Sequence, residues 1–397
     1  NCKLMVMISV AEAKRKIIEN CPAPKIIQVP LAGAGGFVLA ENLFAPMDAP
    51  HYNQSAMDGY AFAYNDWDRK SGLDVIGEVQ AGNTFKAGIK PMQALRIFTG
   101  AAVPPSADTV VIQENVQRED NVIFIKDPNL LKGNNVRIAG SQTKKADLVL
   151  QKGHLLTPAS IALLAGLGIS YVHVFSLPSV SIIATGKELL KHGECLVEGK
   201  IYESNSFGLN AVLHQMGIFP SSIQIVDDNE TEICRAINNQ LHVDILLITG
   251  GVSVGDYDFV IAALKKCAVK TIFHKVKQKP GKPLFFGTCN QSLVFGLPGN
   301  PASVLTCFYE YVAEAIKCYT QNQFFNISWM PLSKSFSKKA GLTFFLKGKI
   351  FHNKIEILDS QESYKMNSFA LADGIIELEE PKEKFEQNEM VRVRVFV

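Results

Sequence analysis

A glycine-rich turn that follows an apolar run is the part of this sequence best suited to hold an anion. Residues 243–249 are mostly apolar and β-branched, which predicts a buried strand of a parallel sheet. Gly250, Gly251 and Gly255 then interrupt the run, so backbone N–H groups can converge there before residues 256–264 continue with helical spacing. We expect a phosphate or another oxyanion at this turn, with an ordinary strand-to-helix turn as the alternative.

Three carboxylates follow predicted strands and could bind a divalent cation. Glu188 comes after a strand predicted over residues 180–184, Asp228 after one over residues 223–226, and Asp258 after the glycine turn. Ligands of an open α/β sheet bind beyond the carboxyl ends of the strands, so we expect these side chains to meet at one edge. Oxygen ligands suit Mg²⁺, which often shares them with substrate phosphates. Taken singly, Asp228 could instead stabilise the start of the next helix.

Two loops stiffened by proline are expected at the same edge of the sheet as these carboxylates. Lys279 and Lys282 belong to the sequence KPGKP and could supply fixed positive charge for an oxyanion, although lysine is more often a solvated surface residue. The sequence LPGNP ends with Asn300 and Pro301, which match the N-cap and the first position of a helix expected over residues 302–319. Helix capping alone is the alternative for this second loop.

The spacing of apolar residues predicts the elements that position these groups. Strands and helices alternate from about residue 178 to 320, as in an α/β domain whose mostly parallel sheet is covered on both faces. After residue 326, apolar residues at every second position predict a small antiparallel barrel or sandwich. Residues 9–20 predict an amphipathic helix that begins with a capping box, and short alternating runs over residues 74–127 predict a small β domain.

We therefore expect a multidomain α/β protein in which a β domain is inserted into a linking region. The expected domains are a linking region over residues 7–45 and 146–177, an inserted β domain over 46–145, an α/β domain over 178–325 and a C-terminal β-barrel domain over 326–397.

The composition excludes several classes of protein. The chain has 397 residues, of which 47% are hydrophobic and 20% charged, and this profile predicts a soluble globular protein of two to four domains. A net charge of +2 argues against a nucleic-acid partner, and no apolar run is long enough to span a bilayer. The eight cysteines show no C-x-x-C pair and are interpreted as thiols of a cytoplasmic protein. The histidines lack the spacing of a zinc site.

Seven motifs, in order along the chain, resemble those of the molybdopterin molybdenumtransferase (MoeA) family, which includes the gephyrin E domain. They are SAMDGYA at residues 55–61, TGAAVPPSADTVVIQE at 99–114, TGKEL at 185–189, YESNS at 202–206, GGVSVGDYD at 250–258, KPGKP at 279–283 and GLPGNP at 296–301.

The resemblance implies a role in molybdenum cofactor biosynthesis. The enzyme would insert molybdate into adenylylated molybdopterin with release of AMP, using Mg²⁺, and would act as a homodimer whose site is shared between subunits. Its partners would be other proteins of the same biosynthesis. The α/β domain resembles a molybdopterin adenylyltransferase, so that activity is one alternative, and a scaffold similar to gephyrin is another. SAMDGYA and the TGA motif favour molybdenum insertion, because stand-alone adenylyltransferases lack those regions.

The resemblance also assigns site residues by position in the motifs. Asp58 and Thr99 would reach into the partner's cleft, and Glu188 and Asp228 would complete the catalytic set, with Asp228 and Asp258 on the metal. The cofactor-binding residues would be Arg137, Gly250, Gly251, Ser253, Lys279, Lys282, Pro298, Pro301, Ser303 and Ser368. The chain departs from the family pattern at Ser141 and Gln142, where Glu-Asp is usual, at Ser106, and at Leu342 and Lys347, where arginines are common.

Overall fold

The computed structural model describes residues 7–251 and 259–396, and the chain divides into two compact units. The larger unit contains residues 1–27, 36–38 and 174–397, and the smaller unit contains residues 28–35 and 39–173. The borders of the four expected domains stay predictions. No helix in the described part of the chain has the length and apolar character needed to cross a membrane.

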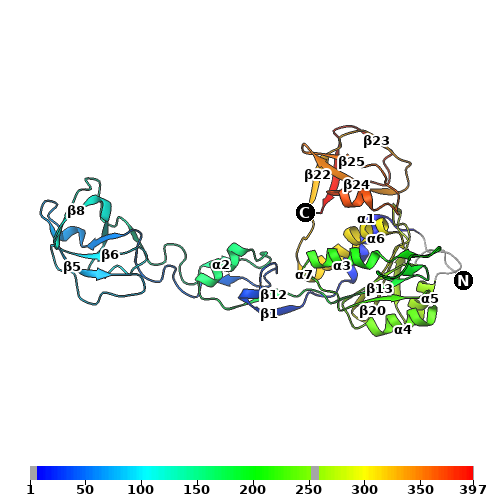
Figure 1. The fold of residues 1–397 in the computed structure, drawn as a ribbon, viewed down its shortest axis with the longest axis horizontal. Helices are drawn as coiled ribbons and strands as arrows, with labels where there is room; N and C mark the ends of the chain where they lie inside the picture. The colour runs from blue at the N-terminus through cyan, green and yellow to red at the C-terminus, as the bar shows by residue number, and fades with distance from the viewer. Residues whose placement is uncertain (1–6, 252–258, 397) are drawn as a thin grey trace. The chain divides into compact units, whose positions relative to one another are not determined.

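A six-stranded sheet forms the centre of the larger unit (Figure 1). Its strand order is β16-β13-β17-β21-β20-β18, and the first four strands run parallel while the last two are antiparallel to their neighbours. The mostly parallel sheet expected from the alternation of strands and helices is therefore confirmed. The strands are β13 (Val180–Thr185), β16 (Ser222–Val226), β17 (Ile245–Thr249), β18 (Lys270–His274), β20 (Phe285–Cys289) and β21 (Ser292–Leu297).

The helices of the larger unit begin close to the expected residues. Ser9 caps α1 by accepting a hydrogen bond from the Glu12 N–H at 3.2 Å, as the capping-box spacing predicts. The expected helix after residue 301 is broken by a π-helical turn over Phe308–Val312. The helices are α1 (Val10–Asn20), α3 (Asn205–Gln215), α4 (Glu230–Gln240), α5 (Phe259–Lys266), α6 (Pro301–Cys307) and α7 (Ala313–Thr320).

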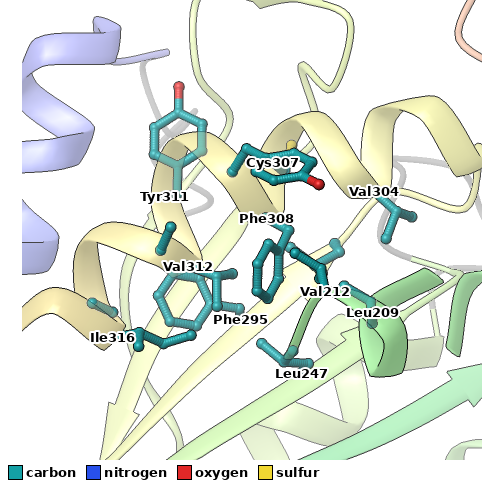
Figure 2. Close-up of a cluster of buried hydrophobic side chains, with 14 of the residues drawn as sticks. Leu209, Val212, Leu247, Phe295, Val304, Cys307, Phe308, Tyr311, Val312 and Ile316 are labelled. Atoms are coloured by element: carbon teal, nitrogen blue, oxygen red, sulfur yellow. The ribbon is translucent and has the colours of Figure 1, made fainter. Parts of the chain in front are cut away.

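Two apolar clusters cover the two faces of this sheet. Helices α1, α3, α6 and α7 share one cluster, in which the aromatic rings of Phe295 and Phe308 are fully buried (Figure 2). Helices α4 and α5 pack against each other and share the second cluster, which includes Ile183, Leu246 and Ile248 of the sheet. Residues of one strand alternate between the two clusters, so β13 and β17 are buried on both faces and read as continuous apolar runs.

The C-terminal part of the larger unit is a second, mostly antiparallel sheet. Its order is β19-β24-β26-β28-β22, with β25 beside β24. The short strand β19 contains Lys279 and pairs with β24, so the lysine loop joins the two sheets of this unit. The elements are β19 (Gln278–Lys279), β22 (Ile327–Pro331), β24 (Thr343–Phe351), β25 (Lys354–Ile357), β26 (Gly374–Leu378) and β28 (Met390–Val395), with the short pair β23 (Phe336–Ser337) and β27 (Lys384–Phe385) and helix α8 (Asn367–Leu371).

A buried ion network holds α1, the π-helical turn and β28 together. The carboxylate of Glu310 lies 2.5 Å from Lys14 Nζ and 2.9 Å from Arg394 Nε, and Arg394 also contacts Glu314 at 2.7 Å. Burial favours the protonated carboxyl, but the Lys14 and Arg394 charges outweigh it and lower the pKa of Glu310 to about 2. Glu310 is therefore an ionised, fully paired buried carboxylate.

The smaller unit is built on its own six-stranded sheet, of order β7-β4-β6-β5-β9-β8. Neighbouring residues such as Ala61 and Phe62 belong to different apolar clusters, as strand geometry requires when both faces are covered. The strands are β4 (Gly59–Phe62), β5 (Leu73–Val79), β6 (Gln93–Ile97), β7 (Thr109–Ile112), β8 (Val116–Glu119) and β9 (Val122–Ile125). This sheet confirms the short β runs predicted over residues 74–127.

Short strand pairs join the outgoing and the returning chain. The pairs are β2 (Leu43–Phe44) with β11 (Leu148–Leu150), β3 (Gln54–Ser55) with β10 (Val136–Arg137), and β1 (Ile26–Pro30) with β12 (Tyr171–Phe175), and helix α2 (Pro158–Gly166) precedes β12. Segments about 80 to 150 residues apart in sequence are therefore neighbours, which is the arrangement that an inserted sheet requires.

Candidate functional site

The glycine turn after β17 lies against the end of β13. A side chain at Gly250 would place its Cβ 2.0 Å from the carbonyl oxygen of Thr185, and Gly250 also has a φ of +104°, so only glycine fits there. A Cβ on Gly251 would lie 3.7 Å from Asp228 Oδ1. Gly250 and Gly251, the described start of the turn predicted to hold an anion, are thus packed against the end of β13 and near Asp228.

Asp228 and Glu188 lie beside this turn, and the Glu188 carboxylate affects the pKa of Asp228. Burial, and then the nearby Glu188 carboxylate, raise the pKa of Asp228 above its usual range. The Oδ1 atom of Asp228 is buried and accepts no hydrogen bond from the described residues, and the hydroxyl of Thr185 is likewise unpartnered among them. A covered carboxylate oxygen without a donor is suited to a cation or a proton.

A cavity of about 740 Å³ opens beside these strand ends within the larger unit. Residues from five segments line it: those after β13 and β17, the segment that leads into α3, the lysine loop, and the loop that leads into α6. Residues 361–364 of the C-terminal part close a further side. Of the predicted site residues, the structure brings together at this cavity Glu188, Gly250, Gly251, Lys279, Lys282, Pro298, Pro301 and Ser303.

The lysine loop gives this cavity its positive charge. Gly281 has a φ of +81°, and its Cβ would lie 2.7 Å from the Cys307 sulfur, so the loop is pressed against α6. The Gln278 side chain donates a hydrogen bond to the Gly281 carbonyl at 2.8 Å. Lys279 and Lys282 form no ion pair with any described carboxylate, and Lys279 Nζ lies 5.2 Å above the Phe344 ring. Both ammonium groups can therefore meet an anionic ligand.

Asn205 is a cavity residue to which the sequence analysis gave no role. Its side-chain amide donates hydrogen bonds to the Thr249 hydroxyl at 3.0 Å and the Gly299 carbonyl at 2.8 Å. Its Oδ1 atom is buried and has no hydrogen-bond donor among the described residues. The residue stands inside the motif YESNS, so the motif carried a signal, but only the structure shows an acceptor held in place with no partner.

Asn300 corrects an expectation from the sequence. It occupies the N-cap position of α6, with Pro301 following, but its side chain makes no capping hydrogen bond. Its amide instead donates to the Ser363 hydroxyl at 2.8 Å. The side chain is drawn to the C-terminal part because that segment lies against the start of α6, as the hydrogen bond from the Ala302 N–H to the Ser363 carbonyl also shows.

The smaller unit contains a second predicted pair, Asp58 and Thr99. Asp58 Oδ1 accepts hydrogen bonds from the Thr99 backbone N–H and from its hydroxyl, each at 2.8 Å. These bonds lower the pKa of Asp58, the backbone bond most strongly. The two residues are therefore hydrogen-bond partners, and their approach to the partner subunit's cavity stays a prediction.

Other predicted site residues lie elsewhere or outside the description. Arg137 is exposed on β10 of the smaller unit. Ser368 is buried in α8, is not part of the cavity wall, and donates its hydroxyl hydrogen bond to the Ser360 carbonyl at 2.7 Å. Ser253 and Asp258 lie outside the described residues.

The described residues offer a partial cation site. No group of three or more histidine, cysteine, aspartate or glutamate side chains among them could hold a metal ion. Mg²⁺, however, is commonly held by one or two carboxylates together with water and substrate phosphates. The Oδ1 atom of Asp228, which is buried beside Glu188 and lacks a hydrogen-bond donor among the described residues, fits that pattern, so these two residues would hold the ion.

Comparisons with known families assign the class of protein. The MoeA N-terminal region (domain I and II) matches residues 8–168, a probable molybdopterin binding domain matches residues 181–317, and the MoeA C-terminal region (domain IV) matches residues 330–396. Along the chain, the first region contains the sheet of the smaller unit, the second contains the mostly parallel sheet of the larger unit, and the third contains the C-terminal sheet. The chain is therefore built as a MoeA-type protein with a molybdopterin-binding α/β domain.

Relatives that align with most of the chain identify its family. A molybdopterin molybdenumtransferase of Haemophilus influenzae is 34% identical over 98% of this chain and 99% of its own length. One from a Nostoc species is 35% identical over 88% of this chain and 78% of its own length. A crystal structure of the molybdopterin biosynthesis MoeA protein from Pyrococcus horikoshii covers 99% of this chain and 100% of its own, with a TM-score of 0.84 and 28% identity. The chain belongs to the molybdopterin molybdenumtransferase family, as the motifs predicted.

Proposed function

We propose that this protein is a transferase that inserts molybdenum into molybdopterin during molybdenum cofactor biosynthesis. Its substrates are molybdate and adenylylated molybdopterin, and AMP is released. The observation that carries the proposal is the cavity that joins Glu188 and the glycine turn to Lys279 and Lys282, because one site then offers acids for a cation and lysines for an oxyanion. The names of the curated relatives support the same activity.

Each wall of the cavity has a separate task in this proposal. Lys279, Lys282 and the Ser303 hydroxyl bind molybdate, since lysine ammonium groups are compact charges that suit a small tetrahedral anion. The backbone N–H groups of Gly250 and Gly251 bind the bridging phosphates of the adenylylated pterin. Glu188 of the cavity wall and Asp228, which lies beside the cavity and is not part of its wall, would hold Mg²⁺, and the ion would neutralise phosphate charge. The donors then hold the metal oxyanion and the pterin substrate in one pocket.

We further propose a cytoplasmic homodimer with the four-domain arrangement given above. In it, Asp58 and Thr99 of one subunit complete the cavity of the other. The support is chemical: Thr99 fixes the orientation of the Asp58 carboxylate and keeps it ionised, yet both side chains remain accessible to a ligand. Partners that supply the adenylylated pterin belong to the same biosynthesis.

One assay tests the reaction. The purified protein is mixed with adenylylated molybdopterin, MgCl₂ and molybdate, and AMP is followed by chromatography. We expect AMP release that depends on molybdate and is lost in the double variant Lys279→Ala/Lys282→Ala. Release that is equally fast without molybdate, or none from a correctly folded protein, overturns the proposal. Formation of adenylylated molybdopterin from ATP and molybdopterin would instead favour the adenylyltransferase alternative.

A further inference from the structure

Two cysteine sulfurs lie in contact on the outer side of the α/β sheet, away from the cavity. Cys234 is in α4 and Cys267 follows the end of α5, and their Sγ atoms are 2.8 Å apart. The two helices pack side by side (Figure 1). A disulfide bond is about 2.05 Å long, so the sulfurs need to approach by less than 1 Å to be bonded.

The surroundings of the two sulfurs differ. Cys234 is partly exposed and receives a contact from the Asn238 side-chain amide at 3.6 Å. Cys267 is 6% exposed and belongs to the apolar cluster under α4 and α5, against which Cys289 also packs. The Cys267 thiol further contacts the Cys234 carbonyl oxygen at 3.4 Å. An oxidant from solvent can therefore reach Cys234 first, and the Cys267 sulfur is in contact with Cys234 for the second step.

We propose that Cys234 and Cys267 are an oxidation site that forms a reversible disulfide between α4 and α5. The inference rests on the contact between the sulfurs, their unequal exposure and the packing of the two helices. It uses no part of the proposed reaction, so either can fail without the other.

The chemistry balances with a small-molecule disulfide such as oxidised glutathione as the oxidant. Cys234 loses its proton and its sulfur attacks the glutathione disulfide, which forms a mixed disulfide and releases one glutathione thiolate. Cys267 then loses its proton, attacks the Cys234 sulfur and displaces the second glutathione. Two protein thiols are oxidised and one glutathione disulfide is reduced to two thiols. Burial raises the pKa of the Cys267 thiol, so Cys267 is the less reactive of the two thiols and acts second.

The bond would restrain the helices that follow two loops of the candidate site. Helix α4 starts two residues after Asp228, and Val260 of α5 lies close to Gly251, whose Cβ would be 3.1 Å from the Val260 side chain. The cross-link closes a loop of roughly 30 residues that contains β17 and the glycine turn. Closing a loop of that length lowers the entropy of the unfolded chain, so oxidation should stabilise the protein.

The test uses the full-length protein, reduced, desalted and then incubated with oxidised glutathione at pH 8. After alkylation under denaturing conditions, peptide mass spectrometry should find the Cys234 peptide joined to the Cys267 peptide. The oxidised protein should melt higher by about 5 °C or more, and a reductant should reverse the shift. Cys195, which is exposed, reports whether the oxidant reached the protein at all.

Substitutions at three cysteines decide the assignment. Cys267→Ser should lose the cross-link and the melting shift and keep glutathione on Cys234, and Cys267→Ala gives the same test if serine disturbs the apolar cluster. Cys234→Ser should lose both and leave Cys267 unmodified. Cys195→Ser should keep both. The proposal is overturned if Cys195 takes up glutathione while Cys234 and Cys267 stay as thiols, or if Cys234 pairs with Cys289 instead.

Discussion

Asp58 of the smaller unit and Asp228 of the larger unit carry the same functional group in opposite electrostatic states. Asp58 is near the surface, and the Thr99 hydrogen bonds lower its pKa. Asp228 has one oxygen covered and unpartnered, and burial together with Glu188 raises its pKa. The first carboxylate is stabilised in its ionised form by hydrogen bonds from the protein. In the second, Thr185 and Lys187 lower the pKa less than burial and Glu188 raise it, and Oδ1 is suited to bind a cation or a proton.

Glu310 shows that burial alone does not decide the outcome. It is buried completely, yet its pKa falls to about 2 because Lys14 and Arg394 surround it. A buried carboxylate with cations on the chain is structural, while a covered carboxylate with a second acid beside it is poised to bind a ligand. The comparison therefore separates a positioned acid, a cation ligand and a structural ion pair, and each can be tested by replacing one carboxylate with its amide.

The largest effect is expected for Asp58→Asn. The amide oxygen can still accept the Thr99 bonds, so the fold should persist, but the negative charge is lost. We expect molybdate-dependent AMP release to fall by about 10²- to 10⁴-fold, which is the usual contribution of a positioned acid or base. Asp68→Asn is the matched control, since Asp68 is also held ionised by local hydrogen bonds, to Ser71, and should leave turnover unchanged. An unfolded Asp58→Asn protein would show that this carboxylate is structural.

The next effect is on stability and concerns Glu310→Gln. Removing this charge leaves the buried Arg394 with Glu314 alone and the half-buried Lys14 with Glu377 alone, so the free energy of unfolding should fall by up to about 3–5 kcal/mol in urea titrations. Because its folded pKa is lower than its unfolded value, Glu310 contributes stability above pH 4.5 that is lost as the pH falls toward 2. The variant should lose that part of the acid dependence. Glu356→Gln, which breaks the exposed pair with Lys334, should cost less than about 1 kcal/mol. An equal cost for both would contradict a structural role of the buried network.

A smaller loss of activity is expected for Asp228→Asn. The amide binds Mg²⁺ weakly, so the Mg²⁺ concentration for half-maximal AMP release should rise by about tenfold, equivalent to ~1.4 kcal/mol of binding. The melting temperature should stay the same or rise, because the ionised carboxylate beside Glu188 is unfavourable in the fold. Asp227→Asn, one residue earlier on the exposed side, is the control and should keep the wild-type Mg²⁺ requirement. A marked drop in melting temperature would assign Asp228 to helix capping.

The smallest effect is a pH dependence that distinguishes the two aspartates. The raised pKa of Asp228 means that it takes up a proton first as the pH falls, whereas Asp58, with a lowered pKa, stays ionised. For stability the sign is the reverse of Glu310, since protonating Asp228 relieves an unfavourable charge as the pH falls through its raised pKa. The half-maximal Mg²⁺ concentration should increase as the pH is lowered from 8 in the wild type and stay flat in Asp228→Asn. The same slope in both proteins would contradict this assignment.

Much of the site could be predicted because its parts are local in sequence. The strand over residues 245–249, the glycines behind it and the lysine loop each follow from a run of a few residues with strong preferences. Placing Glu188, Lys279 and Lys282 at one cavity followed from a general rule on where parallel sheets bind ligands. Seven motifs in order predicted the family, and the comparisons confirmed it.

The remaining features depend on neighbours that are distant in sequence. Asn300 bonds to Ser363 and not to its own helix, and the free acceptor of Asn205 results from bonds to Thr249 and Gly299. Ser368 donates its hydroxyl hydrogen bond to Ser360 and is not part of the cavity wall, although its position in the family pattern predicted a role at the site. No local preference encodes such contacts, because each needs two segments that meet only after folding.

The amino-acid sequence by itself determined the strands and helices, the turn chemistry and the family of this protein. Secondary-structure propensity, the periodicity of apolar residues and the placement of glycine act over a few neighbouring residues, so they can be read from the sequence alone. Only the tertiary structure decided that Asp228 is left without a partner, that Glu310 is neutralised by Lys14 and Arg394, and that Cys234 meets Cys267. Charge states and sulfur contacts depend on distance and burial in space, and these exist only once the sheets have packed.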